Sequence, residues 1–400
     1  MSATDVPQVL YAPHKVFKKI VHEPKYLGPL IVLIIFLVAQ VCSAYVVASK
    51  YYVEQTMPTA GQGDAWTQNA ALWTASSSMT VRNNTVDYIN STYYGDVSIG
   101  FSASNVSSVW MENNWGTLNG SVNCGADGFK NVSLRVKIVI PNVKPESVTL
   151  YLYSLSSSNF HRDLTSAFSN STINVWNNIT VPLGSESGWV NSSTEAKWEN
   201  ITGIKMEFTW STNQSVDLLV DGLFFRGIFK DPIESYGASY LASSALNAVT
   251  PFLFQWLLLT GLIYIIIKGL KGNVVWKPLM VAVGCALVTM VIQAIILAGV
   301  YTTLPQIHYP LEVLAGVPGE FQAAYQVLLD SIATATQISG IVQIAVYVWT
   351  VALGAIITRE VTGQAAEGAP ISLQFGWMKS LLTSAASFLL TIIILVFLGV

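Results

Sequence analysis

The sequence is poor in charge and in the residues from which most catalytic and metal sites are built. Asp, Glu, Lys and Arg make up only 11% of its 400 residues, and 52% of the residues are hydrophobic. A soluble domain carries about 25% charged residues. The chain also has only four histidines and three cysteines. Part of it must therefore lie where charge is not tolerated, and few residues remain for acid–base or metal chemistry.

These absences exclude several functional classes. The net charge of −3 comes without a basic stripe, which argues against nucleic acid as a partner. Cys124 is the one cysteine outside the apolar runs, so no disulfide can form within the polar region, and no zinc-ligand spacing is present. No histidine lies in an apolar run, which excludes haem or copper ligation there. No Walker, Rossmann, G-x-S-x-G or H-E-x-x-H pattern occurs. We therefore predict that the protein is not an enzyme and has no catalytic cofactor.

Five apolar runs are long enough to cross a bilayer as helices. A helix over residues 27–48 would be roughly 33 Å long, which is enough to span the hydrocarbon core. None of the five runs contains Asp, Glu, Lys, Arg or His, which argues against ion-coupled transport. The predicted transmembrane helices are residues 27–48 and about 246–267, 278–301, 335–358 and 380–400.

The distribution of lysines predicts the orientation of these helices. Four lysines precede the first run and three lie between the second and the third, whereas residues 302–334 carry acidic residues and no basic one. Positive charge favours the cytoplasmic side of a membrane. Residues 1–26 are therefore predicted to be cytoplasmic, and residues 49–245 and the C-terminus to be extracytoplasmic, in a multi-pass protein of the plasma membrane.

Glycosylation sequons support the same orientation. Ten N-x-S/T sequons fall in the segment that is predicted to be outside, and none falls elsewhere. A sequon acts as a glycan acceptor only on an exposed, extracytoplasmic surface. The predicted glycosylation sites are Asn83, Asn90, Asn105, Asn119, Asn131, Asn170, Asn178, Asn191, Asn200 and Asn213.

Residues 13–22 form an amphipathic segment just before the first run. Val16, Phe17, Ile20 and Val21 would share one face of a helix, and three lysines would share the other. Such a helix can lie on the inner membrane surface with its lysines near anionic lipid. We therefore expect membrane lipid to be a partner of this segment, chiefly as an anchor.

The extracytoplasmic segment has the pattern of an antiparallel β-sandwich. Short alternating stretches are separated by turn residues, most clearly at 134–140, 148–153, 173–181, 204–210 and 216–229. Strands of about six residues with a turn every 8–12 residues are typical of sandwiches. We predict an all-β domain over residues 49–245 with its core at 62–230, carried by a multi-span helical membrane domain.

Three motifs in this segment resemble jelly-roll carbohydrate-binding modules. The stretch from Trp176 to Gly184 is similar to their "W-x-x-I-x-V-P-L" strand, and Trp198 to Ile204 resembles their "W-x-x-I-x-G-I" segment. Residues 219–225 resemble the final strand, often "I-D-x-I-x-F". The three occur in the family's order over about 55 residues. The resemblance implies a jelly-roll fold and a surface that binds glycans.

The same resemblance implies where a ligand and a metal ion would sit. Family members stack sugar rings on exposed aromatic side chains, and some hold a structural calcium ion. Trp110 and Trp115 flank a polar Asn-Asn pair outside a clear strand alternation, so they are the candidate ligand-binding residues. Most of the other tryptophans are expected in the core. Asp221 is the candidate calcium ligand, with a structural role in a turn as the alternative.

The plan of five spans resembles the Yip family (Ypt/Rab-interacting membrane proteins). Ala12-Pro13, Phe17, Ile20 and Pro24 match the "P-x-x-x-F-x-x-I-x-x-x-P" pattern of prokaryotic members, and the basic turn at 268–273 also matches. The chain lacks the long cytosolic region that contacts small GTPases in eukaryotic members, so GTPase binding is not expected. Dense sequons, no disulfides and the prokaryote-like pattern together favour an archaeal plasma membrane.

Three functions are compatible with these features. The first is a non-catalytic cell-surface protein whose outer domain binds carbohydrate on a Yip-like anchor. The second is a transporter or an accessory subunit of one. The third is a structural protein of a surface layer or of a larger membrane complex. The corresponding partners are surface glycans, other membrane subunits or further copies of the chain.

Overall fold

The computed structural model describes residues 5–116, 120–154, 158–364 and 375–399. These residues form two compact units, each built from segments that are distant in the sequence. The helical unit comprises Met1–Tyr51, Asp231–Ile307 and Leu329–Val400, and the β unit comprises Tyr52–Lys230 and His308–Leu328. The loop between the third and fourth predicted spans therefore belongs largely to the β unit.

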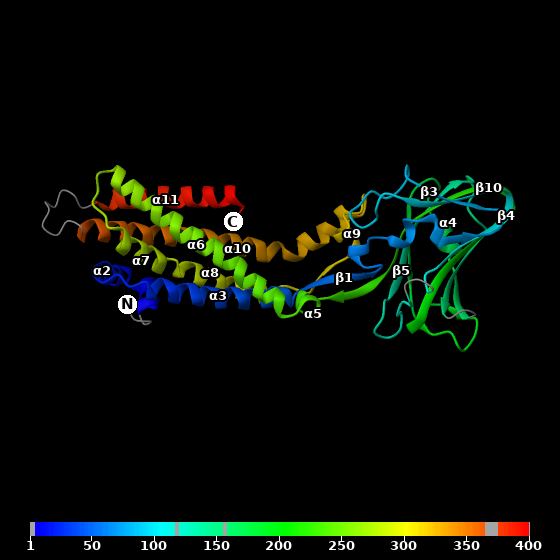
Figure 1. Ribbon diagram of the computed structural model, residues 1–400, viewed down its shortest axis with the longest axis horizontal. Coiled ribbons are helices and arrows are strands. Elements are labelled where there is room, and N and C mark those ends of the chain that lie inside the picture. Colours follow the sequence, from blue (N-terminus) through cyan, green and yellow to red (C-terminus); the bar gives the residue numbers. More distant parts are fainter. Residues whose placement is uncertain (1–4, 117–119, 155–157, 365–374, 400) are drawn as a thin grey trace. The chain divides into compact units, whose positions relative to one another are not determined.

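The helical unit contains five helices that are long and apolar enough to cross a membrane, as predicted. Figure 1 shows them running along one another, from α3 in blue to α11 in red. α7 and α8 together make the third span. The helices are α1 (Asp5–Tyr11), α2 (Pro13–His22), α3 (Leu27–Ala48), α5 (Pro232–Tyr236), α6 (Ala238–Gly269), α7 (Trp276–Ala286), α8 (Val288–Thr302), α10 (Phe321–Gln364) and α11 (Trp377–Leu398).

Small and hydroxyl side chains allow these helices to pack closely. α3 packs against α6 and α8, and α11 packs against α6. A Cβ atom added to Gly354 of α10 would lie only 2.2 Å from the Ser384 Oγ of α11, and Ser384 Oγ donates to the carbonyl of Val351 at 2.8 Å. Close approach through small residues and a few interhelical hydrogen bonds is the usual basis of helix association in lipid.

The amphipathic helix α2 packs against the bundle rather than presenting its apolar face to lipid. Val16, Phe17, Ile20 and Val21 are all buried, and they share one hydrophobic cluster with residues of α3, α6 and α7. The expected apolar face is therefore present. This face packs against α7, and the location of the helix at the membrane surface stays a prediction.

The β unit is an antiparallel β-sandwich, which confirms the predicted fold class. Its strands are β1 (Tyr51–Met57), β2 (Trp73–Ala75), β3 (Thr80–Asn84), β4 (Ser98–Asn114), β5 (Asn131–Ile140), β6 (Ser147–Ser154), β7 (Ser158–Asp163), β8 (Asn177–Pro182), β9 (Val190–Asn191), β10 (Ile201–Lys230) and β11 (Ile307–Tyr309). Short helical turns connect them: η1 (Ala60–Gln62), η2 (Ala65–Thr67), η3 (Ala70–Leu72), α4 (Thr165–Ser169), η4 (Trp198–Asn200) and α9 (Leu311–Leu314).

Two long strands, β4 and β10, each contribute to both layers of the sandwich. The first part of β10 (201–209) lies between β4 and β6, with β7 and β9 beyond. The second part (216–226) lies between the first part of β4 and β5, with β3 and β8 outside them. The register shifts between the two parts, at Thr209 and Gln214, where both strands bend. One hydrophobic cluster fills the space between the layers.

Ion pairs join the segment after β11 to the strands of the β unit. The Arg226 guanidinium contacts the carboxylates of Glu54 (2.7 Å) and Glu312 (2.5 Å), and the Arg135 guanidinium contacts Glu320 at 2.9 Å. Glu54 comes from β1, and Glu312 and Glu320 come from residues 308–328. The β unit is therefore larger than the predicted core of 62–230, because β1 and a segment 80 residues downstream of β10 complete it.

Candidate functional site

The solvent side of the β4–β10–β6–β7 layer carries a group of aromatic and charged side chains. Along each strand the neighbouring residues point into the core: Val109, Met111, Leu150, Leu152, Ile204, Met206 and Phe160 are all at most 2% exposed. Since alternate residues of a strand point to opposite faces, the residues between them point outward. This outer surface, called here the aromatic face, consists of Trp110, Glu112, Tyr151, Tyr153, His161, Lys205 and Glu207.

The strand register places these side chains in rows across the layer. Lys205 lies opposite Glu112 on one side and opposite Tyr151 on the other, and Tyr151 lies opposite His161. In the next row Glu207 lies opposite Trp110. Gly203 lies opposite Tyr153, and a Cβ added to it would lie 2.9 Å from a backbone oxygen and 3.2 Å from the Tyr153 ring. Glycine at this point of the "W-x-x-I-x-G-I" motif therefore makes room for the Tyr153 ring.

Polar contacts hold the rings of the aromatic face in place. Lys205 Nζ lies 4.9 Å from the centre of the Tyr151 ring and 5.5 Å from that of Trp110, and it donates to Glu207 Oε2 at 3.2 Å. Tyr153 donates its hydroxyl hydrogen to Glu112 Oε2 at 2.9 Å. Cations over aromatic faces and charge-assisted hydrogen bonds restrict side-chain motion. The face is therefore ordered before any ligand arrives.

The tyrosine hydroxyls of this face stay protonated across the physiological range. Partial burial raises the pKa of Tyr153, and the hydrogen bond to the Glu112 carboxylate raises it further. Burial also raises the pKa of Tyr151, with a smaller contribution from the charge of Glu207. Neutral hydroxyls, carboxylates and one ammonium group are hydrogen-bonding partners for a hydroxylated ligand, but they include no activated nucleophile.

Of the two tryptophans predicted to bind ligand, the structure places only Trp110 on the aromatic face, where its side chain is half-buried. Trp115 is 2% exposed, its ring stacks on Trp66 at 4.3 Å, and its Nε1 donates to the carbonyl of Ile201. The end of β4 turns this ring into the core, so Trp115 does not offer an open stacking surface. The edge of the Trp66–Trp115 pair lines a separate cavity of 340 Å³.

Asp221, the residue predicted to bind calcium, is fully buried in β10 beside a second buried carboxyl, Asp64. Burial raises the pKa of Asp64 to about 6. Burial, the hydrogen bond to Asp64 and the charge of Asp64 raise the pKa of Asp221 to about 9. Two carboxylates in contact cannot both ionise at low cost. The pair therefore holds a proton at neutral pH.

The surroundings of this pair fit a proton better than a calcium ion. Asp221 accepts hydrogen bonds from the backbone N–H groups of Ile89 (2.7 Å) and Gly222 (2.8 Å), and Asp64 accepts from Thr67 and Gln68, each at 2.7 Å. Calcium requires six to eight oxygen ligands, whereas these carboxylates already face N–H and O–H donors. Within the described ranges no cluster of three or more His, Cys, Asp or Glu residues is placed to hold a metal ion. Asp221 is thus a structural residue of β10.

The structure places nine of the ten predicted glycosylation sites, and Asn119 lies outside the described residues. Asn131 and Asn200 are half-buried, and the other seven are exposed. Asn178 is a special case: its Oδ1 accepts from Arg135 at 2.6 Å and its Nδ2 donates to Glu320 at 3.2 Å. A glycan on Nδ2 would compete with that contact, so we expect Asn178 to be the least favourable acceptor.

Sequence reasoning found one residue of the aromatic face and missed the other six. Four of the missed residues lay within stretches that the alternation already identified as strands, at 148–153 and 204–210, whereas Glu112 and His161 lay outside them. The outward-facing residues of these two stretches could have indicated the face. They read Tyr-x-Tyr and Lys-x-Glu, which is unusually aromatic and charged for residues that point to solvent. Only the strand pairing shows that Trp110 lies against the same residues.

Comparisons with known proteins give weak matches that cover only part of the chain. No protein-family model matches the chain. No curated protein matches it either. Among solved structures, the chain is similar to a carbohydrate-binding module described under "promiscuous specificity" in the β-sandwich superfamily (11% identity, 39% of this chain, 57% of that one, TM-score 0.26). It therefore spans little more than half of that structure.

Two further solved structures have a similar level of likeness. The module CtCBM11 is 12% identical over 40% of this chain and 90% of its own length, with a TM-score of 0.27. The CBM22-2 xylan-binding domain of Paenibacillus barcinonensis Xyn10C is 10% identical over 41% of this chain and 94% of its own length, with a TM-score of 0.24. At this level the likeness says nothing about ligand, so the argument for function rests on the aromatic face.

Proposed function

We propose that this protein is a non-catalytic membrane protein of the cell surface whose β unit binds carbohydrate through the aromatic face. The observation that carries the proposal is the grouping of Trp110, Tyr151 and Tyr153 with Glu112 and Lys205 on one solvent side of a rigid sheet. Sugar recognition needs this combination, because a sugar ring presents an apolar face for stacking and a rim of hydroxyls for hydrogen bonds.

The helical unit would serve as the anchor of this binding unit. Its five candidate spans and the lysine distribution support an orientation with the N-terminus inside and residues 49–245 outside. The resemblance to Yip proteins, the sequons and an archaeal plasma membrane belong to the same proposal. A single stacking site on a small ligand buries little surface and would bind weakly. Several copies in one membrane would then be needed for retention of a surface glycan.

A glycan array probed with the full chain in phosphatidylcholine nanodiscs tests the proposal. Trp110→Ala should weaken binding about tenfold, because loss of a stacked aromatic contact costs about 0.5–1.5 kcal/mol in addition to the apolar area it buried. Trp176→Ala is the matched control. Trp176 is also a half-buried tryptophan of the β unit, but its Nε1 donates to Asp87 and it is not part of the aromatic face.

The controls distinguish a lost site from a lost fold. Both variants should keep the near-UV circular dichroism signal of a folded β unit. Equal loss of binding in the two variants would mean that the aromatic face is not the site. If the folded wild-type protein binds no glycan on the array and co-purifies with a fixed set of membrane subunits, the scaffold function replaces the proposal.

A further inference from the structure

Two polar cavities lie inside the helical unit, within the residues that form the candidate spans. The first has a volume of 550 Å³ and lies between α3, α6 and α8; Gln40, Asn247 and Gln293 contribute to its lining. The second has a volume of 330 Å³ and lies between α6, α8, α10 and α11; Gln255, Gln293 and Gln343 contribute to its lining. Pro251, Met290 and Gln293 line both. Volumes of about 300–1,000 Å³ are typical of small-molecule sites.

Three amide side chains lining these cavities have no hydrogen-bond partner among the described residues. They are Gln40, Gln255 and Gln293, and Gln255 is only 9% exposed. Glutamines in membrane-spanning helices usually hydrogen-bond between helices, and the structure does not show such bonds for these three within its described ranges. Each free amide offers two N–H donors and one carbonyl acceptor. Burying such a group in a membrane without a partner is costly.

Three threonine hydroxyls of the same bundle are paired within their own helices, whereas the hydroxyls of Ser339, Ser380, Thr383 and Ser387 are buried without a partner among the described residues. Thr260, Thr358 and Thr362 each donate to the carbonyl one turn earlier in their helix at 2.7–2.8 Å. The amides of Gln40, Gln255 and Gln293 have no such partner within the described ranges, whereas Gln343, the fourth glutamine of the two linings, donates to the Tyr347 hydroxyl. Pro251 lies inside α6 and has no N–H to donate to the carbonyl of Asn247, four residues earlier. Both residues line the first cavity.

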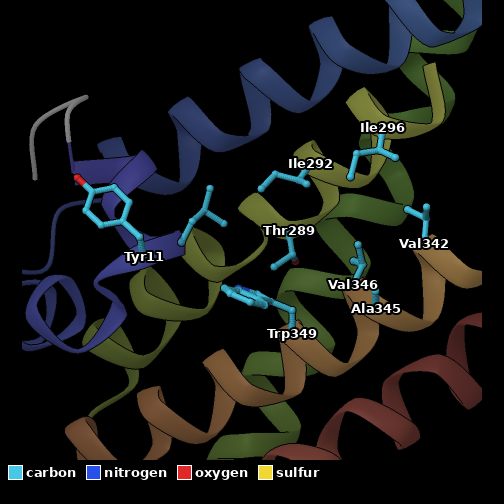
Figure 2. Close-up of a pocket in the computed structure, with 9 residues that line it drawn as sticks. Tyr11, Thr289, Ile292, Ile296, Val342, Ala345, Val346 and Trp349 are labelled. Carbon is cyan, nitrogen blue, oxygen red and sulfur yellow. The ribbon is translucent and has the colours of Figure 1, made fainter. Parts of the chain in front are cut away.

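A third cavity, of 370 Å³, has an apolar lining and so differs from the two polar cavities. It lies between α1, α8 and α10, and Figure 2 shows its lining side chains, almost all apolar, from Tyr11 to Trp349. Apart from the phenol of Tyr11, the hydroxyl in this lining is that of Thr289, which is hydrogen-bonded to Thr350 at 2.8 Å. On α8, Ile292 and Ile296 line this apolar cavity while Gln293 lines the polar ones. Val346 lines both the apolar cavity and the second polar cavity.

We propose that the two polar cavities around Gln293 form one binding site for an uncharged, polyhydroxylated group, such as a sugar or glycerol moiety. The lining has no charged side chain, which excludes an anionic or cationic ligand on grounds of desolvation. Amide groups that both donate and accept are matched by hydroxyls, which do the same. The group can belong to a neutral lipid, whose chain would fit the adjacent apolar cavity, or to a free sugar.

The experiment uses the full chain in nanodiscs of phosphatidylcholine that contain a minor fraction of monogalactosyl diacylglycerol. After exchange into a zwitterionic detergent without a sugar headgroup, the lipids retained by the protein are quantified by mass spectrometry. In a second arm, free galactose is added without galactolipid and the thermal shift of the protein is measured. Retention of galactolipid severalfold above its bulk fraction identifies a lipid headgroup, and a thermal shift with galactose alone identifies a free sugar.

Matched variants connect either signal to the cavity. Gln293→Leu and Gln255→Leu should each reduce it about tenfold, as expected for the loss of one to two hydrogen bonds in a dry site. Gln337→Leu is the control, because Gln337 lies in the same candidate span as Gln343 and lines neither polar cavity. The glycan array reports on the aromatic face and galactolipid retention reports on the cavity, so failure of this proposal is distinguishable from failure of the proposed function. No retention and no shift, or equal effects of Gln293→Leu and Gln337→Leu, would overturn the proposal.

Discussion

Replacing Arg226 by methionine should destabilise the β unit strongly. The Arg226 guanidinium is in contact with Glu54 through two hydrogen bonds, at 2.9 and 2.7 Å, and with Glu312. The Glu54 side chain is 3% exposed and that of Glu312 is 16% exposed. Methionine has a similar length and no charge, so Arg226→Met leaves two buried carboxylates next to each other. Removing one partner of a buried ion pair costs about 3–5 kcal/mol.

Thermal unfolding of the full chain in mild detergent, followed by near-UV circular dichroism, measures this loss. A cost of 3–5 kcal/mol corresponds to a fall in melting temperature of about 6–20 °C for a domain of this size. Arg82→Met is the matched control. Arg82 pairs with Asp217 on the surface of the same unit, with side chains 44% and 23% exposed. Exposed pairs contribute about 0–1 kcal/mol, so this variant should shift the transition by about 4 °C at most.

The dependence on pH gives a second check on the cause. Burial alone would raise the pKa of Glu312, but the hydrogen bonds and charge of Arg226 outweigh it and lower the pKa below its usual value. Stability from this pair is therefore present above the unfolded pKa and is lost as pH falls through the folded pKa. The difference between wild type and Arg226→Met should shrink in acid. A triple variant, Glu54→Gln with Arg226→Met and Glu312→Gln, should recover part of the loss. If Arg226→Met unfolds like Arg82→Met at neutral pH, the network does not stabilise the unit.

Three further results are expected. The pKa of Asp221 is raised to about 9 in the folded chain, which therefore keeps a proton that the unfolded chain loses above about pH 4. The free energy of unfolding should consequently fall by up to about 1.4 kcal/mol per pH unit between about pH 5 and 9. Asp221→Asn should remove this slope, and a slope that persists in the variant would exclude the carboxyl pair as its source. About 10 mM calcium, well above weak-site affinities, should not shift the melting curve, and a clear stabilisation would restore the calcium assignment. Protease added to intact cells should leave the Lys268–Lys277 turn uncut, and cleavage there would refute the proposed orientation.

Much of the fold was predictable from the sequence because its signals are local. Each candidate span is a continuous apolar run, and the strands at 134–140, 148–153 and 204–210 show two-residue alternation. Helix ends were harder to predict: α6 begins at Ala238 rather than near 246, and α10 extends from Phe321 to Gln364. Their polar ends contain Ser, Thr, Gln and Asp, which lower the average hydropathy without ending a helix.

The candidate site was less predictable because it depends on pairing between distant strands. Trp110 and Trp115 are five residues apart and look alike in sequence, yet one faces solvent and the other stacks on Trp66. β4 ends at Asn114, so the two-residue alternation of the strand could not predict whether the Trp115 side chain faces the core or the solvent. Likewise, the ionic partners Glu312 and Glu320 lie in a loop about which the sequence predicts only that it is on the outer side of the membrane, from the distribution of charge. Nothing local in that loop indicates contact with Arg226 or Arg135.

The divided sequence of the β unit has a consequence for biosynthesis. Residues 52–230 leave the ribosome first, but Glu312 and Glu320 follow only after α6, α7 and α8 have been made. Translation proceeds at about 5–20 residues per second, so Arg226 waits roughly 4–17 seconds for its second carboxylate. During that interval the sandwich is incomplete and its arginines are partly unpaired. Completion of the β unit therefore depends on synthesis and insertion of the second and third candidate spans, α6 and α7–α8. A chain that stalls during their insertion would display an unfinished, protease-sensitive β unit.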